Sequence, residues 1–274
     1  LYEVKRSAPI MHRIRSRKTE EEIAQIQNAV NITAKAFQRV LRFVKPNVKE
    51  YEIEAEITHE FLRNGSRGHA YTPIIASGYN ACVLHYIVND DTCKDGDVIL
   101  MDFGCEYGGY ASDLSRSIPV NGKFSPRQRD VYNAVLNVQK EATKLLIPGV
   151  FLGDYHKQVG ELMEKELIGL GLLKADEVAK QDPEKPLYKK YFMHGTSHFL
   201  GIDVHDVGLW HEPIVEGMVF TVEPGIYIPD ENIGIRIENN IVVTKDGQDD
   251  LFKDIPREVE EIEALMALGK KAFA

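Results

Sequence analysis

The sequence predicts an α+β protein built from two similar halves, each with two helices followed by a pair of antiparallel strands. Three observations carry this prediction. Apolar residues recur at helical spacing in four segments, and two pairs of short apolar strands follow them. Segments of the first half also resemble segments of the second. A chain of 274 residues is long enough to bury a sizeable core.

The first half contains two expected helices. Thr19-Glu-Glu-Glu22 is a capping box that opens the first helix, and Pro46 limits its end. Its apolar face carries Ile23, Ile26, Val30, Phe37, Leu41 and Val44. The second helix runs from about Glu50 to Arg63, before Gly65. Residues 97–104 and 110–120 then follow as two strands joined by a Gly-rich turn.

The second half shows the same order. Ser125 and Pro126 open a helix as its cap and first residue, and Asp154 is expected to cap the next helix, which runs to about residue 170. Residues 175–190 are rich in charge and proline and are predicted to form a surface loop. Residues 218–228 and 234–244 are the expected strand pair. Residues 264–274 are predicted to form a short helical tail.

The two halves share sequence as well as element order. KPNVKEYEI (45–53) resembles IPGVFLGDY (147–155), and DGDVILMDFG (95–104) resembles EGMVFTVEPG (216–225). The second pair aligns Asp102 with Glu223, so acidic residues occupy the same place in both halves. We interpret the repeat as an internal duplication whose halves face each other across a pseudo-two-fold axis.

Composition excludes several classes of protein. The chain holds 33 Lys and Arg against 42 Asp and Glu, a net charge of −9, which argues against binding to nucleic acid. It has no apolar run of the roughly 18 residues that span a bilayer and no signal-peptide pattern, so a cytoplasmic protein without membrane contact is expected. Its three cysteines form no C-x-x-C pair, which disfavours disulfides and a thiolate zinc site.

Four carboxylates interrupt the apolar strands. Asp102 and Glu223 break the first strand of each pair, and Asp113 and Glu238 lie on the return strands, so antiparallel pairing brings them together. Buried carboxylates that converge repel each other unless a cation lies between them. With His198 they form a set of five oxygen and nitrogen ligands, which suits Mn, Co or Zn and is large enough for two ions that share carboxylates.

Three further histidines belong to the same region. His85 lies 17 residues before Asp102, and His205 lies 18 residues before Glu223, so they are expected on opposite walls of one site. His194 shares its segment with His198. Imidazoles that do not bind metal can donate to a developing oxyanion or move protons. The alternative for His205 is a structural histidine paired with a flanking aspartate.

Four segments carry a resemblance to a known family: MDFGCEYGGYASDLSRS (101–117), HGTSHFLGIDVHDVG (194–208), TVEPGIYI (221–228) and GIRIEN (234–239). They resemble the pita-bread metallopeptidases, and among these the Xaa-Pro aminopeptidases first and the Xaa-Pro dipeptidases second. The resemblance implies the pita-bread (creatinase/aminopeptidase) fold, two pseudo-symmetric ααββ halves around a curved antiparallel sheet. It also implies that residues 1–274 form one catalytic domain, with 1–17 as a linker from an N-terminal domain.

The resemblance implies a role for each candidate ligand. Asp113 and Glu238 would bridge two divalent metal ions, Asp102 would bind one ion, and His198 and Glu223 would bind the other. The implied metal is Mn²⁺, with Co²⁺ or Zn²⁺ as alternatives. All five ligand positions are occupied by residues that can bind a metal, unlike those of non-catalytic relatives.

The resemblance also implies a set of residues around the substrate, namely His85, His194 and His205. Glu223 is the implied proton acceptor. Arg236 is expected to pair with a nearby carboxylate, for which Asp102 is the candidate, and Tyr227 is a further candidate for the site.

The implied activity is release of the N-terminal residue from peptides with proline at the second position, through a hydroxide that bridges two metal ions. Two alternatives remain. An Xaa-Pro dipeptidase would bind the substrate's C-terminal carboxylate as well, and a non-enzymatic peptide- or protein-binding module would use the same fold without catalysis. A homodimer or higher homo-oligomer, held through the N-terminal domain, is also expected.

Overall fold

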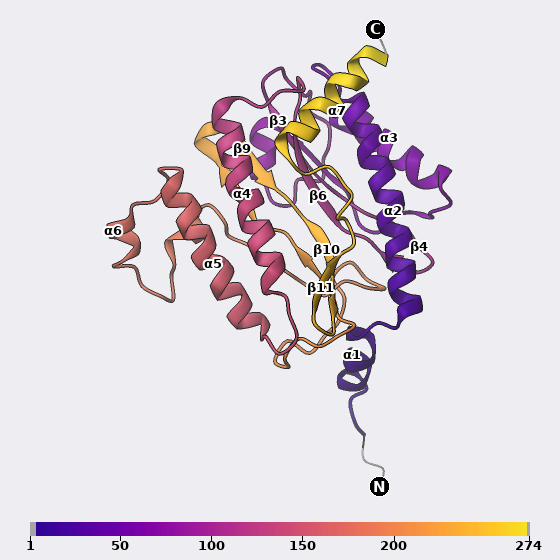
Figure 1. Ribbon diagram of the computed structural model, residues 1–274. Coiled ribbons are helices and arrows are strands. Elements are labelled where there is room, and N and C mark those ends of the chain that lie inside the picture. Colours follow the sequence, from indigo (N-terminus) through magenta and orange to yellow (C-terminus); the bar gives the residue numbers. More distant parts are fainter. Residues whose placement is uncertain (1–3, 273–274) are drawn as a thin grey trace.

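A computed structural model describes residues 4–272, and in it each half contributes a pair of packed helices. In the first half α2 (Glu20–Phe43) packs on α3 (Glu50–Arg63), and in the second half α4 (Pro126–Leu145) packs on α5 (Leu152–Gly169). Figure 1 shows α2 and α4 on the same side of the strands, with α7 (Val259–Ala272) near one end of both.

The strands form four antiparallel groups. The first half supplies two three-stranded groups: β2 (Ile74–Ser77), β3 (Val98–Phe103) and β6 (Leu114–Pro119), and β1 (Gly68–His69), β4 (Cys105–Tyr107) and β5 (Tyr110–Ala111). The second half supplies β7 (Val219–Val222), β10 (Asn239–Thr244) and β11 (Gly247–Asp250), and the hairpin of β8 (Gly225–Ile228) and β9 (Ile233–Arg236). Strands β1 and β2, which precede the predicted strand pair, are additions to the predicted order.

Most helix signals are confirmed and one is wrong. Capping boxes at Thr19 and Ser125 open α2 and α4. Asp154 does not cap α5, because the helix begins at Leu152 with Phe151 at the cap position. Asp154 lies instead in the first turn, where its negative charge interacts favourably with the helix dipole.

Two segments are more ordered than the sequence suggested, and a third, the C-terminal tail, is helical as predicted. Residues 8–16 of the predicted linker form helix α1 (Ala8–Ser16). The predicted loop 175–190 contains α6 (Ala175–Val178) and a 3₁₀ turn at Leu187–Lys190. The predicted tail is the later part of α7 as far as residue 272, and its last two residues lie outside the described chain.

Both strands predicted for the second half are split at a carboxylate. The 218–228 segment divides into β7 and β8 around Glu223-Pro224, and 234–244 divides into β9 and β10 around Ile237-Glu238. Pro224 has no amide hydrogen to continue a ladder. In the first half, 110–120 divides in the same way into β5 and β6 just before Leu114. The breaks place three carboxylates where the strands change partners.

The two halves meet where β6 runs beside residues 236–240. The Glu238 amide donates to the Ser115 carbonyl at 3.0 Å. The Asn240 side chain accepts from the Asp113 amide at 3.0 Å and donates to its carbonyl at 2.7 Å. The fully buried Arg116 guanidinium donates to the carbonyl of Glu238 at 2.7 Å. These bonds hold carboxylates from opposite halves against each other.

One large apolar core lies between the helices and the strands. Cys93 and Cys105 are buried within it as free thiols, as small hydrophobic side chains. Over residues 4–272, no helix combines the length and the apolar character needed to cross a membrane.

Candidate active site

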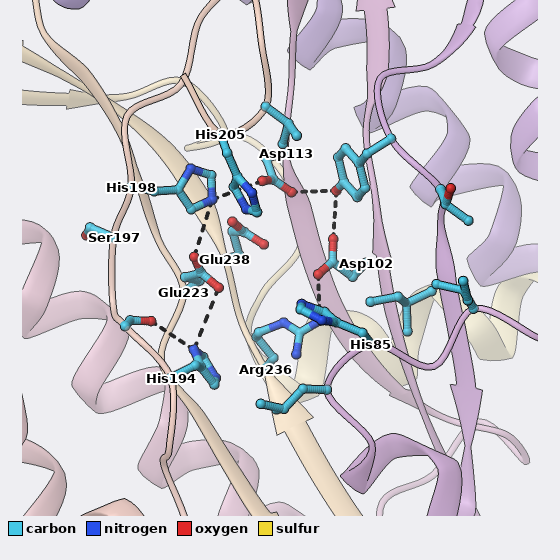
Figure 2. Close-up of a pocket in the computed structure, with 17 residues that line it drawn as sticks. His85, Asp102, Asp113, His194, Ser197, His198, His205, Glu223, Arg236 and Glu238 are labelled. Atoms are coloured by element: carbon cyan, nitrogen blue, oxygen red, sulfur yellow. Dashed lines mark hydrogen bonds and ion pairs between the residues drawn. The ribbon is translucent and has the colours of Figure 1, made fainter. Parts of the chain in front are cut away.

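A cavity of about 400 Å³ opens at the junction of the two halves. It is lined by every residue that the sequence assigned to the site except Tyr227: His85, Asp102, Asp113, His194, His198, His205, Glu223, Arg236 and Glu238. Figure 2 shows Asp102, Asp113 and His85 on one side of the cavity, facing His194, His198 and Glu223 on the other. Each half therefore supplies one wall.

The centre of the cavity is a cluster of carboxylates around one imidazole. Ligand atoms of Asp113, His198 and Glu238 all lie within 4.8 Å of one another. The Nε2 atom of His198 lies 3.4 Å from Asp113 Oδ2 and 3.4 Å from Glu223 Oε1. Asp102 joins the cluster through Tyr71, whose hydroxyl contacts both Asp102 and Asp113.

Glu238 has an unsatisfied acceptor in this cluster. Its side chain is fully buried, and Oε2 accepts from the Ser115 hydroxyl at 2.7 Å. Among the residues that the structure describes, none is a hydrogen-bond partner of its Oε1. Burial and the nearby carboxylates of Asp113 and Glu223 raise the pKa of Glu238 well above its ordinary value. A buried oxygen without a donor, surrounded by other carboxylates, is the environment that a cation would complete.

The other central groups titrate abnormally for the same reason. Burial raises the pKa of Asp113, and burial raises the pKa of Glu223 to about 7. Burial lowers the pKa of His198, but the hydrogen bond to Asp113 and the charge of Glu223 outweigh it and raise the pKa to about 9. Each shift has the direction expected where several carboxylates are buried together, since the cluster favours any form that offsets its negative charge.

A second chain of hydrogen bonds fixes the edge of the cluster. The Arg236 guanidinium donates to Asp102 Oδ2 at 2.5 Å and to the Tyr227 hydroxyl at 2.8 Å. His194 Nε2 lies 2.8 Å from the same hydroxyl, and its Nδ1 lies 3.8 Å from Glu223 Oε2. Burial and the Arg236 charge lower the pKa of His194 to about 4, so this imidazole is neutral near pH 7. Tyr227 thus reaches the site through Arg236 and His194.

His85 and His205 lie at the open side of the cavity. Both are exposed, and both line the pocket. The His205 ring packs edge-on against His198, with 4.4 Å between ring centroids. The flanking aspartates bind other partners, since Asp203 and Asp206 both accept from Arg15. The arrangement leaves both imidazoles free to face a ligand.

Sequence reasoning missed the residues that hold the site together from outside. Tyr71 precedes an apolar strand that was not predicted, and a lone tyrosine in a loop gives no signal of its own. Two residues of α5 support the loop between His194 and His198. Tyr155 accepts from the Ser197 hydroxyl at 3.1 Å, and His156 Nδ1 accepts from the Thr196 amide at 3.3 Å.

The donor set fits divalent metal ions. Four carboxylates and one imidazole, with no thiolate, suit hard or borderline metals. The unsatisfied Oε1 of Glu238 and the raised pKa values of its neighbours are the signs of a site whose charge balance needs a cation.

Comparison with known proteins agrees with this geometry. Residues 24–245 match metallopeptidase family M24, and the chain belongs to that family. It is 44% identical over 277 residues to the Xaa-Pro aminopeptidase of Escherichia coli, covering 96% of this chain and 62% of the relative. It is 36% identical over 304 residues to the Xaa-Pro dipeptidase of Rattus norvegicus, covering 94% and 61%. The chain thus spans about three fifths of the length of these relatives.

Solved structures show the same fold. A variant of E. coli aminopeptidase P superimposes with a TM-score of 0.91 at 42% identity, covering 97% of this chain and 62% of that one. A putative aminopeptidase P from Bacillus anthracis gives a TM-score of 0.91 at 41% identity, covering 97% and 61%. The protein therefore has the pita-bread fold that the resemblance implied.

Proposed function

We propose that the protein releases the N-terminal residue from peptides with proline at the second position, using two divalent metal ions. The observation that carries this proposal is the convergence of five ligand residues from both halves on one cavity, with the orphaned Oε1 of Glu238 among them. Relatives and solved structures named Xaa-Pro aminopeptidase or aminopeptidase P support the substrate class.

Asp113 and Glu238 would be shared by the two ions, Asp102 would bind one of them, and His198 and Glu223 would bind the other. Mn²⁺ is the proposed metal, while one E. coli aminopeptidase P structure is described as zinc-substituted. Divalent ions in such a site polarise a substrate carbonyl and lower the pKa of water toward neutrality.

The protein's own side chains supply the rest of the chemistry. Glu223 lines the same cavity and is the proposed proton acceptor. His205 and His85 face the open side of the cavity, where they can donate to the oxygen of a tetrahedral intermediate. The leaving nitrogen of an Xaa-Pro bond has no hydrogen and must gain a proton before it departs.

The cavity favours an aminopeptidase over a dipeptidase. A dipeptidase must bind the substrate's C-terminal carboxylate within the same small cavity. Among the described residues that line it, Arg236 is the one Arg or Lys, and its guanidinium is 4% exposed and already bound to Asp102 and Tyr227. The other cationic candidates are imidazoles. A longer peptide, whose carboxylate lies outside the cavity, needs no such partner.

Product analysis by mass spectrometry tests the proposal. The metal-stripped protein is reloaded with Mn²⁺ and given an Xaa-Pro dipeptide, an Xaa-Pro-Yaa tripeptide and an Xaa-Ala-Yaa control. Release of Xaa from the tripeptide but not from the control is the expected result. Cleavage of the dipeptide alone would favour the dipeptidase. Absence of cleavage, together with a full count of bound metal, would favour a binding module. The predicted homo-oligomer stays a prediction, which the mass of the particle in solution tests.

A further inference from the structure

A buried ion pair lies just behind His205, outside the cavity. Lys18 Nζ is 3.2 Å from Asp206 Oδ2, and both side chains are only 1% exposed. Arg15 donates to the other oxygen of Asp206 at 2.5 Å. Asp206 follows His205 directly in the chain, so its carboxylate fixes the backbone next to that imidazole. The proposed mechanism does not use Lys18, Arg15 or Asp206.

The loop that carries His205 is closed around this ion pair. The Asp206 amide donates to the Phe199 carbonyl at 2.9 Å, and the Gly201 carbonyl accepts from the Ala111 amide at 2.8 Å. A β-carbon on Gly201 would lie 2.1 Å from Asp206 Oδ2 and 2.7 Å from Lys18 Cε. The loop therefore packs directly on the two charged side chains, without room for another atom between them.

Lys18, the cation of the pair, is held in place by contacts outside the loop that carries His205. The Lys18 amide donates to the Gly217 carbonyl at 2.7 Å, and Arg17 forms an antiparallel bridge with Met218. Residues 17 and 18 are thus fixed to the segment that leads into β7 and Glu223. Lys18 therefore links the loop of His205 to the strand that carries a proposed metal ligand.

Two charges this well buried strongly constrain the conformation around them. Desolvation of both ions is costly, and their attraction offsets it only while they stay in contact. A shift of the loop would separate Asp206 from Lys18 and leave both charges in a low-dielectric environment. The pair thus favours the one loop conformation in which His205 stands against His198, with 4.4 Å between ring centroids.

We propose that Lys18 and Asp206 are positioning residues for His205, so that the segment before α2 sets the geometry of the catalytic cavity. This inference rests on the proposed function, because it assigns His205 a part in the reaction. Displacement of a reacting group by about 1 Å can cost about a hundredfold in rate. Loss of Lys18 should therefore lower kcat far more than it raises KM.

The test is a double-mutant cycle in the Mn²⁺-loaded protein with an Xaa-Pro-Yaa tripeptide. Lys18→Met is the informative variant, because it removes the charge, keeps a side chain of similar length and leaves Arg15 paired with Asp206. Its circular dichroism spectrum checks that it folds. We expect kcat to fall roughly ten- to hundredfold with KM changed less than about twofold. The kcat of His205→Ala should fall at least as far. Adding Lys18→Met to His205→Ala should lower kcat no further. Equal losses in both backgrounds would overturn the proposal.

Two controls separate positioning from general damage. Lys253→Met removes an exposed lysine paired with Asp249 and should leave kcat unchanged. Val40→Ala removes core volume from α2, far from the loop, and should lower the melting temperature without lowering kcat. A kcat loss in Val40→Ala equal to that in Lys18→Met would mean that Lys18 acts only through stability, and would overturn the proposal.

A readout that does not depend on activity keeps the inference separate from the proposed function. In the metal-free protein, where no paramagnetic Mn²⁺ broadens the signals, the imidazole resonances of His205 can be assigned by their loss in His205→Ala. They should shift or broaden in Lys18→Met and stay unchanged in Val40→Ala. If the wild-type protein cleaves no Xaa-Pro peptide, the proposed function fails, and these resonances still decide the positioning. Unchanged His205 resonances in Lys18→Met would refute it in either case.

Discussion

Replacing Glu238 by Gln should have opposite effects on stability with and without metal. Glu238 is fully buried beside Asp113, and their candidate ligand atoms lie within 4.8 Å. Two ionised carboxylates at that distance repel by about 3 kcal/mol at an effective dielectric constant near 20. Gln has nearly the same shape, can still accept from the Ser115 hydroxyl and carries no charge.

Without metal, the Gln variant should be as stable as the wild-type protein or more stable, by up to about 3 kcal/mol. The gain shrinks as the pH is lowered, because burial and the neighbouring carboxylates raise the pKa of Glu238 well above its ordinary value, and a protonated carboxyl does not repel Asp113. Raising the pH ionises the wild-type group and enlarges the gain.

With metal in excess, the wild-type protein should be more stable than the Gln variant. Binding at 1,000 times the dissociation constant stabilises the folded protein by about 4 kcal/mol, and the variant loses most of this because it lacks the proposed bridging carboxylate. Urea unfolding in a chelator and in excess Mn²⁺ measures both differences. The control is Glu166→Gln, which changes a carboxylate on α5 whose pKa is also raised by burial. Its free energy of unfolding should differ from that of the wild-type protein by the same amount in the chelator and in excess Mn²⁺. A Glu238→Gln variant equally destabilised in both conditions would refute the reasoning.

Three further predictions follow from the same geometry. Arg236→Lys should lower kcat/KM about ten- to hundredfold in steady-state assays, because one ammonium cannot bind Asp102 and the neighbouring hydroxyl as a guanidinium does. Gly104→Ala should lower the free energy of unfolding by about 3 kcal/mol or more in urea titrations, because its β-carbon would lie 1.8 Å from the Ser112 carbonyl oxygen. With the metal removed by a chelator, the wild-type protein should have a higher free energy of unfolding than His198→Asn at low pH. This difference should fall by up to about 3 kcal/mol as the pH rises through 7 to 9.

The sign of the His198 prediction follows from the direction of its shift. The pKa is raised from 6.5 to about 9 by Asp113 and Glu223 against the effect of burial. The stabilisation is complete below pH 6.5 and is lost as the pH rises through about 9. For Gly104→Ala, the matched control is Gly153→Ala, because the β-carbon added there would meet no atom of residues 4–272 within 4 Å. Unchanged kcat/KM in Arg236→Lys, equal unfolding free energies for the two alanine variants, or a pH-independent His198 difference would each contradict its prediction.

The helices were predictable because their signals are local. The capping boxes at Thr19 and Ser125 satisfy amide groups within four residues of themselves, so these signals do not depend on distant parts of the chain. Asp154 failed as a cap because an Asp near a helix start is also favoured within the first turn, where the dipole attracts it. The strand breaks at Glu223 and Glu238 were not predictable, because they depend on which partner strand lies alongside.

The sequence by itself determined the set of candidate ligands and their order in two repeated halves. A carboxylate in an apolar strand must find a partner wherever the chain folds, so Asp102 and Glu223 were recognisable without coordinates. Only the tertiary structure decided what surrounds them, namely Tyr71 between two aspartates, the orphaned oxygen of Glu238, and Lys18 behind the loop of His205. Those contacts join residues far apart in the chain, and sequence spacing carries no information about them.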